Sequence, residues 1–467
     1  MPAASCARGR TGIATTDPLL VGIDVGTSAC KAVVVTVDGA ERSRGAQPTP
    51  WTALATGAQV QPEALLSAAM EAARQALDAA PSGPVAGVGV ASMAETGVLL
   101  DAVGQPLLPA VAWNDQRGAR DAEAMAQRLG AGEIARRTGL AVGPKLTAVK
   151  YRWLRRHKSQ VVAGRRWLSV AEWIVHAVGG QAVAEPSLAS RTGWLDLDRR
   201  AWWPESLAWS GIGAQMLPEL RQAGEPAGRV RGDLGRLAGA VLTVAGHDHQ
   251  AAAVGVGATG PGDVLDSCGT AEAFLRAVGP LSATVRQRAV ATGLSVGSHV
   301  LPRRMAVLGG FPSGDRLRKI LEILDVADRE ALDASAGAAQ PPVPALSVED
   351  LDRLVEDPGP RVSSPAQLWR AAAEAVARHG AEVLERLEAL TGPRERLFVV
   401  GGWSRCAPLL AAKEELLGSL IRPAVAEPGA RGAALLAGVA AGVFADVAAV
   451  PAPDGLLAAH STSGNRS

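Results

Sequence analysis

The stretch LLVGIDVGTSACKAVVVTVDG, residues 19–39, decides the fold of this chain. Its two apolar segments, 19–25 and 31–37, are separated by the turn residues Gly26-Thr27 and are followed by a second turn, Asp38-Gly39. Val-rich segments bounded by Gly, Thr and Asp are typical of a β-hairpin. The pattern predicts that the folded part of the chain opens with a strand, a tight turn and a return strand.

The second half of the chain repeats this arrangement. Asp24-Val25-Gly26-Thr27 is echoed by Asp266-Ser267-Cys268-Gly269-Thr270, and an apolar segment resumes after both turns. Strand and helix periodicities alternate through the rest of the chain, which favours an α/β protein built from two related domains. Strands are expected at 85–91, 109–113, 241–245 and 397–400, and helices at 62–79, 117–129, 145–157, 366–390 and 431–444. We interpret the basic face of the helix at 145–157 as solvated surface.

The domain boundary is expected near residue 245, after a Gly-rich segment. We predict a disordered leader over 1–18, an N-terminal domain over 19–244, a C-terminal domain over 245–450 and a disordered tail over 451–467. The segment 335–365 is rich in Pro, Ala and Asp, and is expected to be an insertion or a mobile loop with short helical patches at most.

Composition excludes several classes of partner. Lys and Arg number 47 against 46 Asp and Glu among 467 residues, so no net field draws the chain to nucleic acid or to an anionic membrane. Four widely separated cysteines indicate neither a disulfide framework nor a zinc knuckle, and fit the reduced cytoplasm. No apolar segment reaches the roughly 20 residues that span a bilayer. Small-molecule chemistry in the cytoplasm is the expectation.

The Gly-Thr turns suit phosphate oxygens, because they expose backbone N–H groups and a hydroxyl without a bulky side chain between them. One such turn is ordinarily structural, but two turns facing each other from two domains would clamp a polyphosphate. Gly401-Gly402, between a strand and a helix, would bring backbone close to a flat ligand. No G-x-x-x-x-G-K-[ST] sequence is present, and the G-x-G-x-x-G match at 255–260 follows a helix and precedes a strand, the reverse of the dinucleotide-binding order.

Asp248 follows a predicted strand and is flanked by His247 and His249. A carboxylate at this place is costly unless it contacts a metal, a hydroxyl or backbone donors. Taken alone, Asp248 is most simply the cap of the Ala-rich helix that follows. The His-x-His spacing would also suit zinc, although no second cluster of ligands is evident.

Seven motifs, in order, resemble the FGGY carbohydrate kinases, which belong to the superfamily of actin and the heat-shock chaperones. The resemblance covers most of the chain. The motifs are GIDVGTS (22–28), VGVASMAET (88–96), PAVAWNDQR (109–117), LASRTG (188–193), AGHD (245–248), SCGT (267–270) and VVGG (399–402). The resemblance implies two ribonuclease H-like domains of the actin-like ATPase type, with ATP and a sugar or polyol meeting in the cleft between them.

The resemblance also implies roles for individual residues. Asp248 would be the general base that takes the proton from the attacking hydroxyl, and Asp24 would hold Mg²⁺ through water. The implied phosphate-binding residues are Gly26, Thr27, Ser28 and Lys31 on the first hairpin, and Gly269 and Thr270 on the second. The implied neighbours of adenosine are Gly314, Gly401 and Gly402. On the sugar side, Glu95 and Trp113 match residues that hold the polyol in glycerol kinases, and His249 falls where those enzymes have Gln.

Several positions depart from the family pattern. Ala94 stands where glycerol kinases have Arg and xylulokinases have Met, and Glu95 replaces the His of xylulokinases, so the substrate does not follow from the motifs. Trp403 stands where Gly is commonest, which would reshape the adenine pocket. The segment 335–365 takes the place of a Gly-Glu-Arg-x-Pro sequence.

These observations predict an ATP-dependent carbohydrate kinase that phosphorylates a hydroxyl of a small sugar, polyol or sugar acid with ATP and Mg²⁺, without a nucleic acid or membrane partner. A homodimer is a candidate assembly. The alternative is a sugar- or nucleotide-binding protein of the same fold with reduced catalysis, against which the joint presence of Asp24, Thr27, Asp248 and Thr270 argues. An actin-like or chaperone-like ATPase is disfavoured because those relatives lack the sugar-side motifs.

Overall fold

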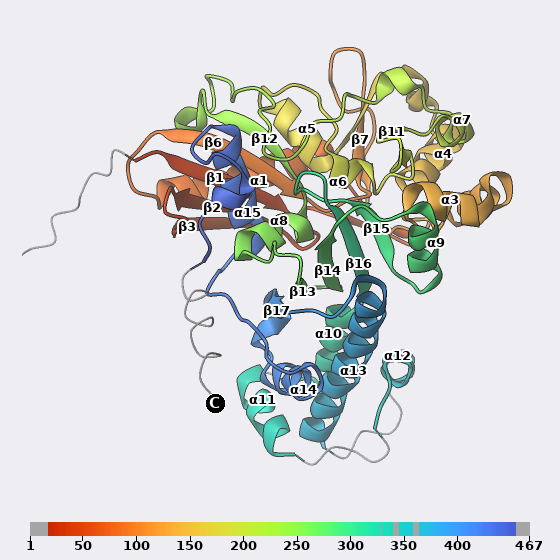
Figure 1. Ribbon diagram of the computed structural model, residues 1–467, viewed down its shortest axis with the longest axis vertical. Coiled ribbons are helices and arrows are strands. Elements are labelled where there is room, and N and C mark those ends of the chain that lie inside the picture. The colour runs from red at the N-terminus through yellow and green to blue at the C-terminus, as the bar shows by residue number, and fades with distance from the viewer. Residues whose placement is uncertain (1–16, 327, 340–344, 358–363, 454–467) are drawn as a thin grey trace, which may run out of the picture.

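Two five-stranded sheets form the framework of the protein (Figure 1). The computed structural model describes residues 17–326, 328–339, 345–357 and 364–453. The first sheet has the order β3-β2-β1-β6-β12, and the second has the order β15-β16-β14-β13-β17. The strands of the first sheet are β1 (Leu19–Val25), β2 (Ala29–Thr36), β3 (Glu41–Pro48), β6 (Val85–Ser92) and β12 (Val241–His247). Those of the second are β13 (Asp263–Cys268), β14 (Glu272–Val278), β15 (Ser295–Ser298), β16 (Met305–Phe311) and β17 (Arg396–Val400).

The two sheets share a topology. In the first, β1 pairs antiparallel with β2 on one side and parallel with β6 on the other. In the second, β13 pairs antiparallel with β14 and parallel with β17. The predicted hairpins are therefore both present, and their likeness extends to the strands around them. The mixed α/β architecture and the two related domains are confirmed.

Helix α15 (Pro428–Ala440) joins the end of the chain to its beginning. It packs on β1 and β6, as Figure 1 shows by the blue helix beside the red strands. The approach is close: a Cβ at Gly22 would lie 1.8 Å from the Ala430 carbonyl oxygen. The helix starts at Pro428, ahead of the expected residue 431, because proline suits the first turn of a helix. Helix α1 (Pro62–Asp78), as predicted, covers the other face of this sheet.

Helix α8 (Asp248–Val256) follows β12 and packs against α15. A Cβ at Gly432 of α15 would lie 1.7 Å from the Ala251 carbonyl oxygen of α8, so glycine is required there. On its other side α8 contributes Ala252 and Val256 to an apolar cluster with Leu265 of the second sheet. The two helices thus form the layer between the sheets.

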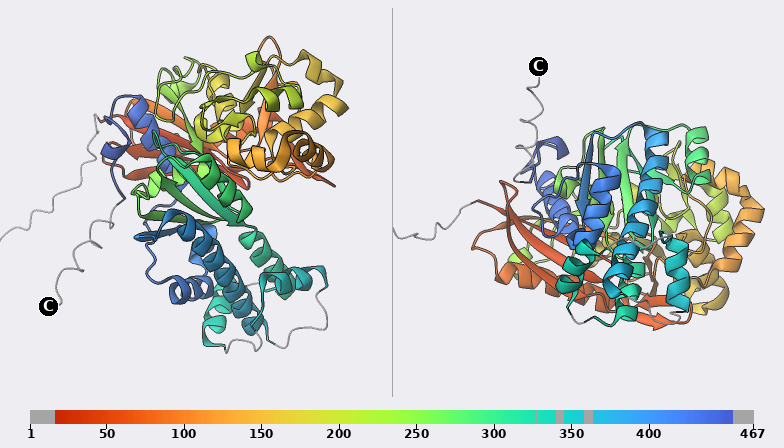
Figure 2. Two further views of the ribbon diagram at one scale, coloured as in Figure 1. Left: turned by 45° about the vertical axis from the view of Figure 1, so that its right-hand side comes forward. Right: turned by 90° about the horizontal axis from the view of Figure 1, so that it is seen from below.

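The far face of the second sheet is covered by helices (Figure 2). They are α10 (Ser313–Leu324), α11 (Arg329–Ala338), α12 (Val348–Glu356), the long α13 (Pro365–Thr391) and α14 (Ala407–Leu417). A short helical patch was expected within 335–365, and helix α12 is one. It is docked instead of mobile, with Leu351 buried and the Arg316 guanidinium 2.6 Å from Asp352. Residues 340–344 and 358–363 lie outside the described part.

The remaining elements lie mostly beside the first sheet. They are β4 (Thr52–Leu54), β5 (Gly57–Val60), β7 (Gly97–Leu100), β8 (Ala110–Val111), α2 (Ala119–Met125), α3 (Ala131–Thr138), α4 (Thr147–His157), β9 (Arg166–Ser169), α5 (Val170–Ala177), α6 (Pro186–Ala189), β10 (Leu195–Asp196), β11 (Ala201–Trp202), α7 (Pro204–Ser210) and α9 (Ala283–Ala291). The strand expected at 109–113 shortens to two residues, which pair with β5. The helix expected at 117–129 ends at Met125 and continues as a π-helical turn.

The predicted boundary at 244/245 falls inside β12, which pairs with β6 as far as His247. The first sheet therefore extends to His247 and takes its covering helix from the end of the chain. The expected leader and tail lie outside the described residues up to residue 16 and from residue 454. Within the described residues, no helix combines the length and the apolar character that crossing a membrane requires.

Candidate active site

The tips of the two hairpins touch. Ser28 Oγ lies 3.2 Å from Thr270 Oγ1, although the two residues are 242 positions apart in the sequence. Both turns are closed by backbone hydrogen bonds, from the Gly26 N–H to the Ala29 carbonyl (3.1 Å) and from the Gly269 N–H to the Ala271 carbonyl (3.2 Å). The structure thus brings together the two turns that the sequence suggested for polyphosphate binding.

Asp24 ends β1 beneath the first turn, with its side chain against the start of α15. A Cβ at Gly429 would lie 2.2 Å from Asp24 Oδ2, and Asp24 Oδ1 is buried without a hydrogen-bond partner among the described residues. Burial and then the charge of Asp248 raise the pKa of Asp24 to about 7, while Lys31 opposes this rise. Lys31 itself pairs with Glu427 at 2.7 Å. A buried carboxylate oxygen without a partner is chemically suited to a hard cation such as Mg²⁺.

Asp248 is the first residue of α8, at the point where β12 ends. Its Oδ1 accepts the His249 backbone N–H at 2.7 Å and lies 3.3 Å from His247 Nε2. Burial, and then the charge of Glu95, raise the pKa of Asp248 to about 7. Burial lowers the pKa of both His247 and His249, so these imidazoles are neutral near pH 7. The helix cap itself is His247, without a side-chain capping bond, so capping does not account for Asp248.

The metal alternative for this trio has a geometric basis. The ligating atoms of His247, Asp248 and His249 all lie within 4.8 Å of one another. Asp248 Oδ1 already accepts the His249 backbone N–H. It lies 3.3 Å from His247 Nε2 and 4.0 Å from His249 Nε2. The same arrangement leaves the Asp248 carboxylate half-buried in a polar setting at the end of a strand.

Glu95 is buried and held at three points. The Arg191 Nε and Nη2 groups donate to Glu95 Oε1 at 2.9 and 2.7 Å, and Lys150 Nζ donates to the Glu95 carbonyl at 3.0 Å. Its φ of 58° is a left-handed conformation that is uncommon outside glycine. The interpretation of the 145–157 helix as solvated is wrong at Lys150, which is 2% exposed. Sequence reasoning quoted Arg191 within a motif and gave it no role, and no local pattern marked Lys150 as buried.

Trp113 connects the sugar-side residues to the first hairpin. Its indole Nε1 donates to Thr27 Oγ1 at 3.0 Å, and Trp51 Nε1 donates to the Thr27 carbonyl at 2.6 Å. Trp113 is therefore partly buried against the hairpin instead of being a core residue.

The predicted glycines of the adenosine side gather around the second hairpin. A Cβ at Gly314 would lie 2.0 Å from the Gly269 carbonyl oxygen, and a Cβ at Gly401, whose φ is 97°, would lie 2.5 Å from the Cys268 carbonyl oxygen. Gly402 has open space around it. Trp403 stacks under the Arg329 guanidinium at 4.7 Å, so the side chain that departs from the family pattern has a defined place beside this hairpin.

A buried charged cluster behind the second hairpin was missed by sequence reasoning. Lys413 of α14 is fully buried and donates to Asp266, to Glu272 Oε1 at 2.9 Å and to Cys268 Sγ at 3.3 Å. The charges of Asp266, Cys268 and Glu272 hold the pKa of Lys413 above its usual range despite burial. Only the fold places Lys413, 147 residues from Asp266, at this point.

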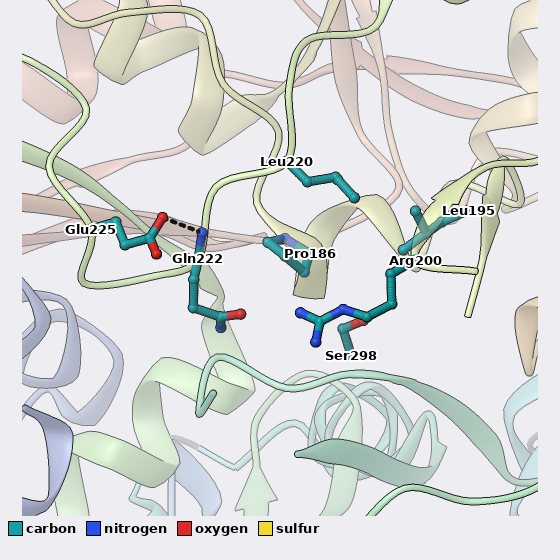
Figure 3. A pocket seen from close by; sticks show the side chains of 7 residues that line it. All are labelled: Pro186, Leu195, Arg200, Leu220, Gln222, Glu225 and Ser298. Carbon is teal, nitrogen blue, oxygen red and sulfur yellow. Dashed lines mark hydrogen bonds between the residues drawn. The ribbon is translucent and has the colours of Figure 1, made fainter. Parts of the chain in front are cut away.

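A pocket of about 220 Å³ lies apart from the hairpin site (Figure 3). Its lining residues are Pro186, Leu195, Arg200, Leu220, Gln222, Glu225 and Ser298. The Gln222 N–H donates to Glu225 Oε2 at 3.2 Å beside it. None of the predicted site residues lines this pocket, so it is distinct from the hairpin site.

Comparison with known proteins identifies the class. Residues 19–255 match the N-terminal domain of the FGGY family of carbohydrate kinases, and residues 349–441 match its C-terminal domain. The chain belongs to the FGGY family of carbohydrate kinases. It is therefore a carbohydrate kinase, a phosphotransferase of a family that uses ATP, as the motifs predicted.

The relatives differ in the substrates that they name. The chain is 30% identical to a glycerol kinase of Cereibacter sphaeroides, over 91% of each chain. It is 31% identical to a xylulose kinase of Streptomyces rubiginosus, over 54% of this chain and 53% of the relative. A solved xylulose kinase structure from Brucella ovis superposes with a TM-score of 0.80 at 24% identity, over 93% of both chains, which shows the shared two-domain fold.

Proposed function

We propose that this kinase transfers the γ-phosphoryl group of ATP to a hydroxyl of a small sugar, polyol or sugar acid, with Asp248 as general base. The observation that carries this assignment is the half-buried carboxylate of Asp248 at the end of β12, with a pKa of about 7. A base whose pKa lies near the working pH combines the correct protonation state with the ability to accept a proton.

The neighbours of Asp248 support this role. The neutral imidazoles of His247 and His249 leave its carboxylate free to accept the substrate's proton, and the His249 N–H orients it at 2.7 Å. Glu95, fixed by Arg191, offers a carboxylate for substrate hydroxyls on the same side. The deprotonated hydroxyl would attack the phosphorus while the bond to the ADP oxygen breaks.

Asp24 would hold Mg²⁺ with its unpartnered Oδ1, and the tips of the two hairpins would hold the phosphates. Bound Mg²⁺ would supply positive charge against the phosphate oxygens. Gly402, which has open space around it, would leave room for adenosine, while Gly314 and Gly401 would hold the neighbouring backbone close to the second hairpin. The buried, free thiols of Cys30, Cys268 and Cys406 fit a reducing compartment, and we place the enzyme in the cytoplasm.

The test is a coupled ADP-release assay on a panel of polyols, ketoses and sugar acids. Asp248→Asn should lower kcat by roughly 100- to 10,000-fold while ATP binding is retained, because the amide cannot take the proton. Asp233→Asn, an exposed acid whose side chain is 72% accessible, is the matched control and should leave kcat unchanged. Unchanged kcat in Asp248→Asn would exclude this base, and slow ATP hydrolysis that no compound accelerates would favour the binding-protein alternative.

A further inference from the structure

The strand that carries the proposed base ends irregularly. β12 pairs in parallel with β6, and the register shifts between Val244 and Gly246, so Ala245 is an extra residue on β12. Gly246 has a φ of 88°, a left-handed conformation that favours glycine. A β-bulge of this kind bends its strand and redirects the side chains beside it, and it is rare in a parallel pair. The bulge therefore sets the direction in which the chain leaves β12, two residues before Asp248.

The side chain of Asp248 has only local contacts of its own. Its Oδ1 accepts the His249 backbone N–H, and its other polar neighbours are the rings of His247 and His249. In the described part of the chain, no residue outside 247–249 makes a hydrogen bond or an ion pair with this carboxylate. The position of the carboxylate consequently follows the backbone from Gly246 to Asp248.

Ser187 of α6 holds this backbone from outside the strand. It is fully buried, and its Oγ accepts the His247 backbone N–H at 2.9 Å. The same Oγ donates its proton to Glu185 Oε2. Because a hydroxyl has one proton and two lone pairs, it makes both bonds at once. One hydroxyl thus joins a buried acid to the residue immediately before Asp248.

Glu185 in turn holds Ser187 in place. Its Oε2 also accepts the backbone N–H groups of Ser187 and Leu188, at 2.8 and 3.1 Å. Glu172 Oε1 accepts the Glu185 backbone N–H at 2.9 Å. A Cβ at Gly246 would lie 2.6 Å from Ser187 Oγ and 2.9 Å from Glu185 Oε2, so the two side chains lie directly against the bulge.

We propose that Ser187 is a positioning residue for phosphoryl transfer: its hydroxyl, held by Glu185, fixes the β12 bulge and so places Asp248 against the acceptor hydroxyl. This inference rests on the proposed role of Asp248 as base and adds a residue that acts through it. Without the hydroxyl, the buried His247 N–H and Glu185 Oε2 lose this partner, which favours a shift of the backbone. A misplacement of about 1 Å can cost about 100-fold in rate.

The test compares Ser187→Thr with Ser187→Val. The two new side chains have nearly the same shape, so the hydroxyl accounts for the difference between them. The coupled ADP-release assay uses the panel compound that stimulates the wild-type protein most. The kcat of Ser187→Val should be about 10- to 100-fold below that of Ser187→Thr, while KM for ATP and for that compound should differ by less than about threefold. Equal kcat values would overturn the inference.

A double-mutant cycle separates positioning from a general loss of structure. The same two substitutions are made in Asp248→Asn protein, in which no base remains to be positioned. There, Ser187→Val and Ser187→Thr should have the same kcat within about twofold. A hydroxyl that only supports the fold would lower kcat by the same factor with and without Asp248, and that result would overturn the inference.

Ser206→Ala is the matched control. Ser206 of α7 is also fully buried, and its Oγ donates to the Gly193 carbonyl at 2.7 Å. Loss of this hydroxyl should lower Tm and leave kcat unchanged, because the bond lies outside the site. A fall in kcat in Ser206→Ala as large as that in Ser187→Val would overturn the inference, since any buried serine would then have the same effect.

The outcomes distinguish this inference from the proposed function. If Asp248→Asn lowers kcat and the two Ser187 variants equal each other, the base stands and the inference fails. If Asp248→Asn leaves kcat unchanged, the proposed base is wrong and the inference falls with it. If no compound stimulates ADP release, crystal structures of Ser187→Thr and Ser187→Val decide. The Asp248 carboxylate should shift by about 1 Å in Ser187→Val alone, and an unmoved carboxylate overturns the inference.

Discussion

Both hairpins have an aspartate shortly before a Gly-Thr turn, but the two aspartates lie on opposite faces of their sheets. Asp24 stands two residues before the turn glycine Gly26, whereas Asp266 stands three residues before Gly269. Because side chains alternate along a strand, a shift of one residue moves a side chain to the other face of its sheet. Asp24 accordingly faces α15, in the layer between the sheets, and Asp266 faces α14 on the outside.

This difference gives the two aspartates different chemistry. Asp24 Oδ1 is buried and has no hydrogen-bond partner in the described part of the chain, which suits a cation. Asp266 is closed off by the protein's own ammonium, Lys413. The residue that occupies the place of Asp24 on the second hairpin is Ser267, which is neutral. The two hairpins thus share a shape, and only the first has its aspartate directed toward the layer between the sheets.

The largest expected effect comes from removing the ammonium behind the second hairpin. Lys413→Met leaves the carboxylates of Asp266 and Glu272 buried without a counter-charge, and should lower the free energy of unfolding by about 3–5 kcal/mol in urea titrations. The triple variant Lys413→Met, Asp266→Asn, Glu272→Gln should recover part of this loss, because the remaining groups are neutral. A loss below about 1 kcal/mol in the single variant would show that the cluster does not hold the hairpin.

On the first hairpin, Asp24→Asn should lower activity without lowering stability. We expect kcat to fall roughly 100- to 1000-fold, the usual effect of deleting one electrostatic contact to the transition state. Tm should be unchanged or higher, because an amide replaces a buried carboxylate without a partner. Asp266→Asn, assayed beside it, should lose stability instead. Full activity in Asp24→Asn would show that the Asp24 carboxylate is not needed for catalysis.

The second hairpin should also be sensitive to its close packing against α10. Gly314→Ala would drive a methyl group into the Gly269 carbonyl, and should cost about 1–3 kcal/mol of stability and raise KM for ATP. Gly402→Ala is the control, because the space around Gly402 is open. Equal effects of the two substitutions would show that the contact between Gly314 and the Gly269 carbonyl does not cause the loss.

The dependence of stability and activity on pH should report the titration of Asp24 and Asp248. The raised pKa of Asp24 and of Asp248 means that the folded protein holds protons that the unfolded chain releases between about pH 4 and 7. Their contribution to stability is present below pH 4 and is lost as pH rises through 7. Catalysis runs the other way, since the base must be deprotonated, and kcat should fall about tenfold per pH unit below 7.

Thermal unfolding followed from pH 4 to 8 measures the first slope, and the pH profile of kcat measures the second. Asp24→Asn should flatten the stability slope relative to wild type, because one of the two acids no longer titrates. An identical slope in the variant would mean that Asp24 does not titrate in this range.

The smallest effect concerns the contact between the hairpins. Ser28→Ala removes the exposed hydrogen bond to Thr270 and should change the free energy of unfolding by no more than about 1 kcal/mol. KM for ATP should rise only a few-fold. Ser43→Ala, which removes a hydrogen bond from the first sheet to the Ala76 carbonyl of α1, is a control for a hydroxyl outside the site. A complete loss of activity in Ser28→Ala alone would show that the Ser28 hydroxyl has a role in catalysis beyond its hydrogen bond to Thr270.

The local structure of this protein follows from its sequence pattern. Alternating apolar segments and Gly-Thr turns specify the hairpins, because strand periodicity and turn geometry depend on neighbouring residues. The ordered motifs also identified the family, and they identified Asp24, Glu95, Trp113 and Asp248 as a set that the fold does bring to one region. The docking of helix α12 did not follow from the sequence, because it depends on the contact between Asp352 and Arg316 of α10.

Which polar side chains meet depends on the tertiary fold. Arg191 reaches Glu95 across 96 residues, Lys413 reaches Asp266 across 147, and Ser28 reaches Thr270 across 242. Lys150 and Lys145 resemble ordinary surface lysines in the sequence, yet one is buried on Glu95 and the other has no partner at all among the described residues. Burial and pairing of charges depend on the packing of distant segments, which local periodicity does not encode, and those pairings determine whether an acid binds a cation, takes a proton or is neutralised by a lysine.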